Sequence, residues 1–452
     1  MPREIITIQV GQCGNQIGTA FWDLLSQEQN LDSKTKLFDM SLSSFFKNYD
    51  EDFNDISKKM NKPIHNIKAR SIIVDTEEGV INQIMKGKNA HLFDELNIIK
   101  NVSGAGNNWG HGYGEYGPEH HDELMDKIRR EVEEASSLQC FLMFHSIGGG
   151  TGSGFGSYIM EQLADNYPDV YRFTASVFPS KDDDVVTSPY NSVLATDKLI
   201  EHADCVFPID NDSLLSLVNA KTNSAVVEEN QKREVFGKMN SIIGHLLSNL
   251  TCSMRFDGKL NVDLNEITMN MVPFPKLHFL ISSMSPLQML LQKTQPRKVD
   301  QIFDDVLQPQ NQLVSCKPNT RKYLAIGLLL RGLVSMSDVS YNIEKIKKKA
   351  NMIWWNQDGF KYGICDEKPS YNNYSLLCLA NNTAITDIFD KLSTRFNKLY
   401  KKKVYVHHYT KYITDYMFDD AIENIRDVKD TYFELDQSEP QSFEFKKYKR
   451  VF

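Results

Sequence analysis

The sequence lacks the features of secreted, membrane-spanning and zinc-binding proteins. Its seven cysteines are scattered, odd in number and never spaced as C-x-x-C, which argues against a disulfide framework or a zinc knuckle and favours a reducing compartment. It contains no run of about eighteen apolar residues, the length that a membrane span needs, and the apolar run after residue 4 is too short for a signal peptide. We therefore expect a soluble, intracellular protein without membrane insertion.

An excess of positive charge is also absent. Lys and Arg number 51 against 59 Asp and Glu, and the net charge of −8 argues against binding nucleic acid through bulk charge. The lysines at 345 and 347–349 are interpreted as a helix face. The histidine pairs at 120–121 and 407–408 lack the i, i+3 or i, i+4 spacing that would put two zinc ligands on one helix face. Neither nucleic acid nor zinc is an expected ligand.

The apolar pattern predicts an α/β fold. Residues 4–10 are rich in β-branched types and lead into GQCGNQ at 11–16, after which apolar residues recur at helical spacing. The same order returns at 138–144, an almost continuous apolar strand that precedes glycines and a second amphipathic helix. Strands buried on both sides are typical of parallel sheets, so we expect a doubly wound, Rossmann-like domain with further strands at 171–178 and 204–209.

At 452 residues the chain is long enough for two or three domains. We place the α/β domain at 1–215, a core helix with an α+β domain at 216–385, and C-terminal helices with a short basic tail at 386–452. The polar stretch 219–234 is predicted as a loop or insertion, and a helix is predicted to begin at Phe236. Further strands are predicted at 277–282, 323–331 and 375–380, and helices at 388–399 and 418–432.

A glycine run, GGGTGSG at 148–154, stands between the second strand and its helix. Glycines there let backbone N–H groups approach phosphate oxygens, and the helix dipole favours the anion. Because no G-K-[ST] is present, this is not a Walker loop, and amides, hydroxyls and a metal must meet the phosphate charge. A formal G-x-G-x-x-G at Gly112, Gly114 and Gly117 follows no predicted strand and is interpreted as a turn-rich loop, which removes the main support for a nicotinamide-dependent enzyme.

Several motifs together carry a resemblance to a known family. Six of them occur in the order in which tubulins carry them: GQCGNQ (11–16), GAGNN (104–108), GGGTGSG (148–154), PYN (189–191), IDN (209–211) and VPFP (272–275). The chain resembles the tubulins nearly end to end. Its opening MPRE is shared with gamma-tubulin, but more of the chain is similar to the epsilon class, namely FWDL (21–24), SSFF (43–46), LQCF (138–141), EHADC (201–205), WNQDG (355–359) and LYKKK (399–403).

The resemblance implies a GTP or GDP pocket formed by loops at the carboxyl ends of the first-domain strands. A phenyl ring at Phe236 replaces the tyrosine that many tubulins stack on the base, and it can still stack. The implied contacts are Gln12 and Cys13 with phosphates and nucleoside, Ala105, Gly106 and Asn107 with the terminal phosphate, Ser146, Gly149, Gly150, Thr151 and Gly152 with the α- and β-phosphates, Asp184 with the ribose, and Asn211 and Asn240 with the guanine edge.

Two departures from the family affect this pocket. Ser188 stands where alpha- and beta-tubulin carry a glutamate near the ribose, which puts that contact in doubt. DTEE at 75–78 replaces the usual DLEP but keeps two carboxylates, Asp75 and Glu77. Because Mg²⁺ binds through carboxylates while keeping several waters, we assign Glu77, with Asp75, the metal role.

The resemblance also suggests where the hydrolytic acid lies. In alpha-tubulin a glutamate at the position of Glu266 reaches across a longitudinal contact toward the GTP of the next subunit, whereas beta-tubulin has a lysine there. A carboxylate within hydrogen-bond reach can orient or deprotonate water, a contribution of roughly 10²- to 10⁴-fold. Our hypothesis is that Glu266, with Asp263 beside it, acts in trans on the nucleotide of a partner.

The resemblance implies an epsilon-tubulin-like GTP-binding cytoskeletal protein of the cytoplasm that acts at centrosomes, centrioles, basal bodies and cilia. The implied role is assembly or maintenance of triplet microtubules. Expected partners are other tubulins (alpha, beta, delta or zeta) and centriolar or basal-body proteins. Two alternatives stay open, a gamma-like microtubule nucleator and a GTPase acting alone. The basic tail at 443–450 differs from the glutamate-rich tails of alpha- and beta-tubulin and could contact an acidic partner.

Overall fold

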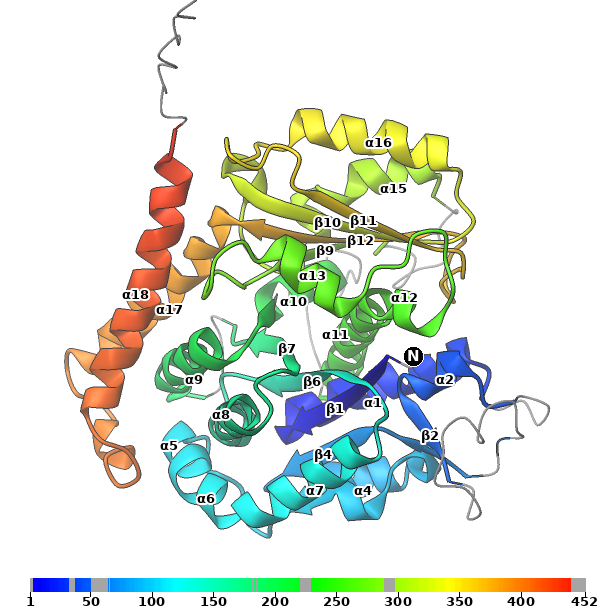
Figure 1. Ribbon diagram of the computed structural model, residues 1–452. Coiled ribbons are helices and arrows are strands. Elements are labelled where there is room, and N and C mark those ends of the chain that lie inside the picture. Colours follow the sequence, from blue (N-terminus) through cyan, green and yellow to red (C-terminus); the bar gives the residue numbers. More distant parts are fainter. Residues whose placement is uncertain are drawn as a thin grey trace, which may run out of the picture.

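The two larger of three β-sheets lie one above the other in the computed structural model, and two long C-terminal helices run along one side of both (Figure 1). The structure describes residues 3–31, 37–49, 64, 66–180, 183, 185–219, 229–287 and 297–439. The predicted tail and most of the predicted loop lie outside these residues. Among the described helices, none combines the length and the apolar character needed to cross a bilayer.

The lower sheet is parallel throughout and has six strands. The predicted strands at 4–10 and 171–178 are confirmed, and those at 138–144 and 204–209 are confirmed within two residues. In spatial order the strands are β5 (Ile98–Lys100), β4 (Ser71–Asp75), β1 (Glu4–Val10), β6 (Leu138–Ser146), β7 (Tyr171–Phe178) and β8 (Cys205–Asp210).

This strand order places a topological switch point between β1 and β6. From β1 the chain adds β4 and then β5 in one direction, and from β6 it adds β7 and β8 in the other. The order is therefore that of doubly wound nucleotide-binding folds, in which ligands bind outside the carboxyl ends of the strands where the direction reverses. The predicted Rossmann-like domain is confirmed, and its loops after β1 and β6 meet at this point.

Both faces of the lower sheet are buried because side chains alternate along each strand. Ile5 and Leu142 pack into one apolar cluster, whereas their neighbours Ile6 and Met143 pack into another on the opposite face. The first cluster is completed by α1 (Gly11–Glu28) and α11 (Glu229–Leu250). The second is completed by α7 (His121–Glu133), α8 (Gly156–Asn166), α9 (Ser188–His202), α17 (Thr386–Tyr400) and α18 (Tyr416–Gln437).

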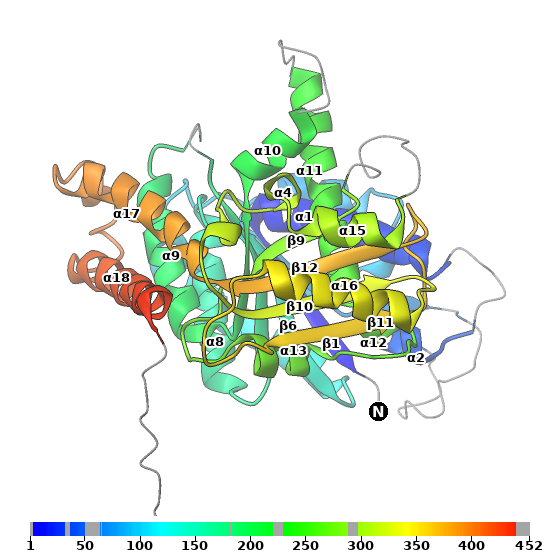
Figure 2. The same ribbon diagram turned by 90° about the horizontal axis from the view of Figure 1, so that it is seen from above.

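The upper sheet is mixed, with strands in the order β11 (Phe360–Cys365), β10 (Tyr323–Arg331), β12 (Ser375–Asn382) and β9 (Ile281–Ser285). Its outer face is covered by α15 (Val299–Val306) and α16 (Met336–Lys349), and α16 lies across β10 to β12 when seen from above (Figure 2). Remaining elements are β2 (Phe46–Asn48), β3 (Ile67–Ala69), α2 (Met40–Ser43), α4 (Glu78–Met85), α5 (Trp109–His111), α6 (Gly117–Glu119), α10 (Asn211–Asn219), α12 (Cys252–Arg255) and α13 (Leu264–Met271).

A buried ionic cluster joins the two layers. Glu28, the last residue of α1, lies 2.9 Å from Arg255 of α12 and 3.0 Å from Arg331 at the end of β10. Burial alone would raise the pKa of Glu28, but the two guanidinium charges and a hydrogen bond from Ser248 outweigh it and lower the pKa to about 2. Glu28 is therefore ionised at neutral pH, and it ties the end of α1 to the upper sheet.

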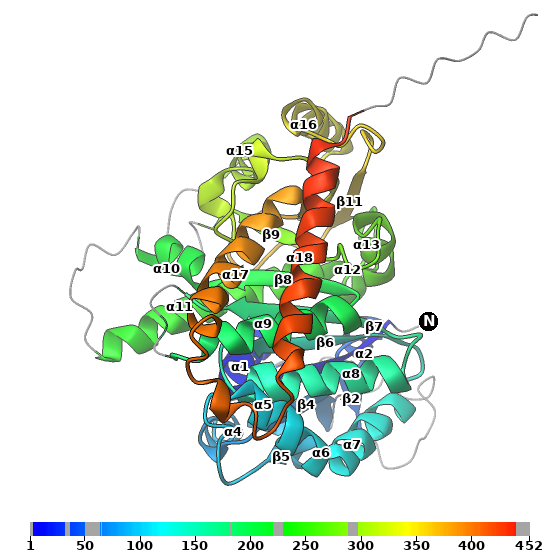
Figure 3. The same ribbon diagram turned by 90° about the vertical axis from the view of Figure 1, so that its left-hand side faces the viewer.

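The C-terminal helices extend over both layers. In Figure 3, α18 runs from the level of α16 down past α9 to the level of α5, with α17 beside it. Asn108 Nδ2 donates to His408 O at 3.0 Å, so the segment between these helices contacts the residue just before α5. The predicted domain limits at 215/216 and 385/386 stay a proposal.

Three predictions were wrong in part. Residues 229–234 are helical because α11 begins at Glu229; the stretch is polar but rich in strong helix formers, and Glu234 pairs with Lys238 at 2.7 Å. The strand predicted at 277–282 begins only at Ile281, because the backbone at 278–280 bonds to Val206 of β8 instead. By contrast, the prediction for the lysines at 345 and 347–349 is confirmed, because they lie on a helix, α16.

The third error concerns the glycines at 112, 114 and 117, which are helical and not a loop. A Cβ on Gly112 would come within 2.7 Å of Gly150 O, one on Gly114 within 2.8 Å of Tyr412 O, and one on Gly117 within 2.5 Å of the Tyr158 ring. These glycines are needed because the helical segment packs closely against three neighbours. The sequence pattern suggested a turn because it does not show this packing.

Candidate functional site

The loops that follow β1 and β6 touch each other at the switch point. Gly11, directly after β1, has a φ of +72°, and a Cβ placed on it would lie 2.9 Å from the backbone nitrogen of Gly152. Both the left-handed conformation and the close approach exclude larger residues here. The helix α1 therefore starts immediately beside the predicted glycine loop.

The glycine loop has an open position at Gly149 and backbone donors for which the structure describes no acceptor. A Cβ on Gly149 would meet nothing within 4 Å, and among the described residues no acceptor takes the N–H groups of Gly149 or Gly150. The loop then winds into a π-helical turn, residues 151–155, that leads directly into α8. Free amides beside the start of a helix form a site for an anion, because the amides and the helix dipole both favour negative charge.

A third loop, residues 104–108 after β5, closes the other side. Gly106 and Asn107 have φ values of +56° and +54°, and the position of a Cβ on Gly106 is open. A Cβ on Gly150 would come within 3.0 Å of the Cβ of Ala105 and 2.8 Å of the nitrogen of Asn108. The predicted contacts at 105–107 and 149–152 are therefore adjacent in space.

One buried side chain, Asn191 of α9, holds these loops together. Its Nδ2 donates to Asn107 O at 2.8 Å and to Gly148 O at 2.9 Å, and its Oδ1 accepts from Trp109 N and from the hydroxyl of Tyr409. The amide thus uses both donors and its acceptor to position two phosphate loops against the C-terminal segment. The sequence contained it within the PYN motif, but nothing in that motif indicated this role.

A second supporting residue that the sequence did not reveal is His145. It is fully buried behind the glycine loop, with Nδ1 2.9 Å from Gly152 O and Nε2 2.8 Å from Ser176 Oγ. Burial lowers the pKa of His145 to about 4, so the imidazole is neutral at physiological pH. Because Gly152 O can only accept, Nδ1 carries the proton and Nε2 accepts from a hydroxyl.

The two predicted metal carboxylates lie beside the same loops. Asp75 ends β4, is nearly buried and accepts from Asn15 Nδ2 at 3.4 Å and from the nitrogen of Glu77 at 3.3 Å. Burial raises the pKa of Asp75 to about 6. Glu77 is exposed, and its Oε1 would lie 2.2 Å from a Cβ on Gly104, so its carboxylate covers the third loop. Thr76 between them shares a 2.6 Å hydrogen bond with Thr151.

The other residues predicted to contact the nucleotide differ in their exposure and in their hydrogen bonds. Gln12 is exposed, and Ser146 Oγ accepts from the nitrogen of Gly148 at 3.3 Å. Burial raises the pKa of Cys13 to about 12, so its thiol stays protonated. Asp184 lies outside the described residues, but the neighbouring Asp183 has Oδ2 3.3 Å from the position of a Cβ on Gly148.

The residues predicted to read the base lie on two adjacent helices. Asn211 is the first residue of α10, directly after β8, so it stands at the same carboxyl edge as the phosphate loops. Phe236 and Asn240 are one turn apart on α11, where Phe236 is 52% exposed and Asn240 half-buried. Ser188, which replaces the family's glutamate, is buried at the start of α9, and its hydroxyl has no hydrogen-bond partner among the described residues.

The two predicted catalytic acids lie at the opposite edge of the sheet. Asp263 pairs at 2.7 Å with Arg3, which directly precedes β1, whereas the phosphate loops follow the other end of that strand. Seven residues of strand span roughly 20 Å at about 3.3 Å each. Glu266 lies on α13 after Asp263 and pairs at 2.5 Å with Lys361 of β11. Neither acid can reach a nucleotide held by its own chain.

Replacing Asn191 by Leu tests the arrangement of the loops. The change keeps the volume but removes the amide, so two carbonyls, one N–H and the Tyr409 hydroxyl lose a buried partner, at a cost of about 1–3 kcal/mol each. We expect affinity for a fluorescent guanine nucleotide to fall roughly 10- to 100-fold. Asn166→Leu, at the exposed end of α8, is the matched control. Equal nucleotide affinity in both variants would contradict the role assigned to Asn191.

Comparison with known proteins agrees with this geometry. Residues 4–219 match the model of the Tubulin/FtsZ family GTPase domain, and residues 275–394 match the tubulin C-terminal domain. The chain is 42% identical to the tubulin epsilon chains of Homo sapiens and Mus musculus over 96% of each chain. It is 34% identical to the tubulin alpha chain of Pneumocystis carinii, over 96% of this chain and 97% of the relative. The chain belongs to the tubulin family, and its predicted resemblance to the epsilon class is confirmed.

Proposed function

We propose that this epsilon-tubulin-like GTP-binding protein acts in the assembly or maintenance of the triplet microtubules of centrioles and basal bodies. The observation that carries nucleotide binding is the glycine loop at the switch point, where the described residues offer no acceptor to the N–H groups of Gly149 and Gly150. The support for the centriolar role is the higher identity to epsilon chains (42%) than to the alpha chain of Pneumocystis carinii (34%).

The nucleotide is proposed to lie along the carboxyl edge of the lower sheet. Its phosphates would face Gly149, Gly150 and the exposed Gly106, and its base would lie between Asn211 and the α11 residues Phe236 and Asn240. No lysine stands in the glycine loop itself. The phosphate charge is therefore met by amides, by the hydroxyls of Ser146 and Thr151, and by a cation.

Mg²⁺ is the proposed cation. The exposed carboxylate of Glu77 lies against the loop that would face the terminal phosphate, which fits a direct or water-mediated contact with a hard cation. Asp75 is held by Asn15 and the nitrogen of Glu77, so it fits an orienting role behind that contact. Bound Mg²⁺ would supply positive charge to the phosphates, and both carboxylates belong to this chain.

A Glu77→Gln variant tests the metal role. It removes the charge without changing the side-chain size, so we expect affinity for GTP in Mg²⁺ to fall about tenfold, as for one lost charge-assisted contact. In EDTA the variant and the parent chain should bind GTP equally. Glu78→Gln is the control because Glu78, the adjacent residue, pairs with Lys100 at 3.0 Å on the surface. If the two variants respond to Mg²⁺ alike, Glu77 is not the metal residue.

The surface that carries Glu266 fits contact with another tubulin subunit. Met269 on the same helix is 74% exposed, and Phe274 packs edge-on against Trp355 with ring centroids 5.6 Å apart although both are partly exposed. Exposed apolar side chains of this kind mark protein contacts. A head-to-tail contact would bring this edge to the phosphate loops of the next subunit. We propose that Glu266, with Asp263 beside it, orients the hydrolytic water there.

Glu266→Ala tests action in trans. In a defined assembly with alpha- and beta-tubulin, hydrolysis of the partner's GTP should fall roughly 10²- to 10⁴-fold, because the carboxylate that orients water is lost. Nucleotide affinity of the variant chain itself should not change, since Glu266 lies at the far edge of its sheet. Asn265→Ala, an exposed neighbour on α13, is the control. Unchanged turnover with Glu266→Ala would exclude this role.

The centriolar role is tested in cells that assemble centrioles. We expect the tagged protein at centrioles or basal bodies, and we expect its removal to leave singlet or doublet microtubules in place of triplets, as counted in electron micrographs. A Gly149→Val chain, which fills the open position of the glycine loop, should fail to restore triplets. Complete triplets after removal would overturn the proposal, and nucleation of microtubules by the purified protein would favour a gamma-like nucleator.

A further inference from the structure

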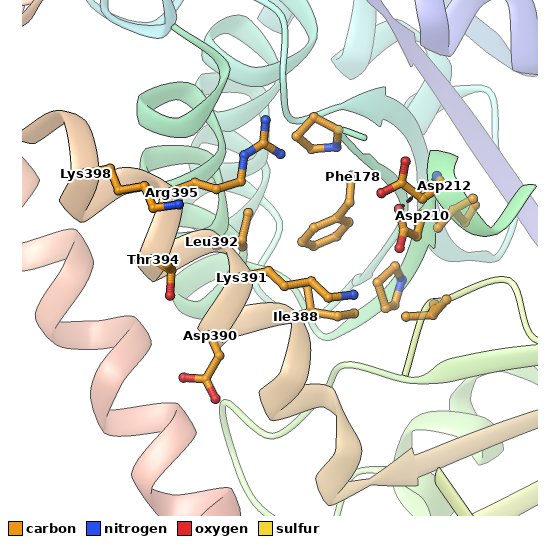
Figure 4. A pocket seen from close by; sticks show the side chains of 14 residues that line it. Phe178, Asp210, Asp212, Ile388, Asp390, Lys391, Leu392, Thr394, Arg395 and Lys398 are labelled. Carbon is orange, nitrogen blue, oxygen red and sulfur yellow. Dashed lines mark hydrogen bonds between the residues drawn. The ribbon is translucent and has the colours of Figure 1, made fainter. Parts of the chain in front are cut away.

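A cavity lies next to the proposed nucleotide site, between the carboxyl ends of β7 and β8 and helix α17. Its volume is about 520 Å³, within the range of small-molecule sites. Figure 4 shows Phe178 near its centre, with Lys391 and Arg395 reaching in from α17 and Asp210 and Asp212 on the facing wall.

This cavity is separate from the proposed nucleotide site. None of its lining residues belongs to the loops 11–16, 104–108 or 148–154. The two sites are neighbours, because Pro179 lines the cavity and its Cβ lies 3.2 Å from the position of a Cβ on Gly148. Asp210 and Asp212 line it on either side of Asn211, the predicted guanine contact.

The floor of the cavity is apolar. Phe178, Ile209, Val314, Ile388 and Leu392 line it, and all of them are at least 95% buried. Such a floor accepts an aliphatic or aromatic body, because removing apolar surface from water is favourable. Water alone would gain little there, because these side chains offer it no hydrogen bonds.

The cations on the α17 wall are not neutralised within the described residues. Lys391 Nζ donates to Ser315 O at 2.9 Å and to Ser315 Oγ at 2.5 Å, and Arg395 Nη1 donates to Ser180 O at 2.8 Å, all of them uncharged acceptors. Lys398, the third cation of this wall, is exposed at the rim. No described carboxylate forms an ion pair with any of the three.

The carboxylates that line the cavity are Asp210 and Asp212 on the wall facing α17, and Asp390 on α17 itself. Asp210 accepts from Ser315 Oγ and from the nitrogen of Asp212 at 3.0 Å. Asp390 pairs with Lys429 of α18 at 2.6 Å and points away from the cavity in Figure 4. Positive charge therefore lies on the α17 wall, the carboxylates of Asp210 and Asp212 lie on the wall that faces it, and the apolar floor lies between the two walls.

We propose that this cavity binds a small amphipathic organic acid. Its apolar body would lie on Phe178 and Leu392, and its carboxylate would face Lys391 and Arg395, whose remaining N–H groups can donate to it. The proposed class of ligand has to meet two requirements. It has an apolar body small enough for the cavity to enclose, and it carries one anionic group at the end of that body. Neither a neutral nor a cationic analogue meets both.

The test uses 1-naphthaleneacetate and its uncharged isostere, 1-naphthaleneacetamide, with binding to the full-length protein followed by ligand-observed NMR titration. We expect the acid to bind at least about tenfold more tightly than the amide, the effect of one charge-assisted contact. Lys391→Gln with Arg395→Gln should remove that preference and leave weak amide binding unchanged. Because Arg395 also holds Ser180, Lys391→Gln alone provides a second variant that should reduce the preference.

Lys345→Gln with Lys348→Gln is the matched control, because it removes the same charge from the exposed face of α16. This control should bind the acid as the parent chain does. Equal binding of acid and amide, equal or tighter binding of 1-naphthylmethylamine, no acid binding at millimolar concentration, or an unchanged preference in both Lys391 variants would each overturn the proposal.

Discussion

The close approach of two backbones at the switch point is the constraint on which the rest of the structure depends. A Cβ on Gly11 would lie 2.9 Å from the nitrogen of Gly152, so Gly11 could not carry a side chain without displacing the glycine loop. This contact fixes where α1 and α8 begin, and the position beside Gly149 stays open. A site made of backbone donors has no fixed positive charge of its own, which is why we propose a bound cation and assign Asp75 and Glu77 to hold it.

The phosphate loops are held from behind by buried polar side chains. Asn191 joins Gly148 to Asn107 and, through Tyr409, to the segment between the C-terminal helices, while His145 holds the carbonyl of Gly152. Because each of these groups is buried, losing a partner costs more than a surface hydrogen bond would. A shift of the loop at 104–108 would therefore displace the segment between α17 and α18, the two helices that lie along both sheets.

The sequence predicted the parts of the fold that depend on local pattern. The strand 171–178 was found to the residue because its last six positions are buried and are all apolar or small. The start of α11 and the helical glycines at 112–117 were missed, since the first depends on polar helix formers and the second on close packing that no neighbouring residue reveals. Asn191 and His145 were missed because the burial and the hydrogen-bond partners of a polar residue depend on the tertiary structure, which the sequence pattern does not show. The glycine loops were found because a positive φ or a close backbone approach requires glycine, and glycine can be read directly from the sequence.

The central claim is that each chain holds a guanine nucleotide at one edge of its parallel sheet and offers its acids at the other, so hydrolysis needs two subunits. Single-turnover hydrolysis of bound GTP, measured over a wide range of concentrations of the tubulin subunits, tests this most directly. The account predicts that the rate constant falls toward zero as dilution separates the subunits and rises again as they assemble. A rate constant that does not change on dilution to monomers would contradict it.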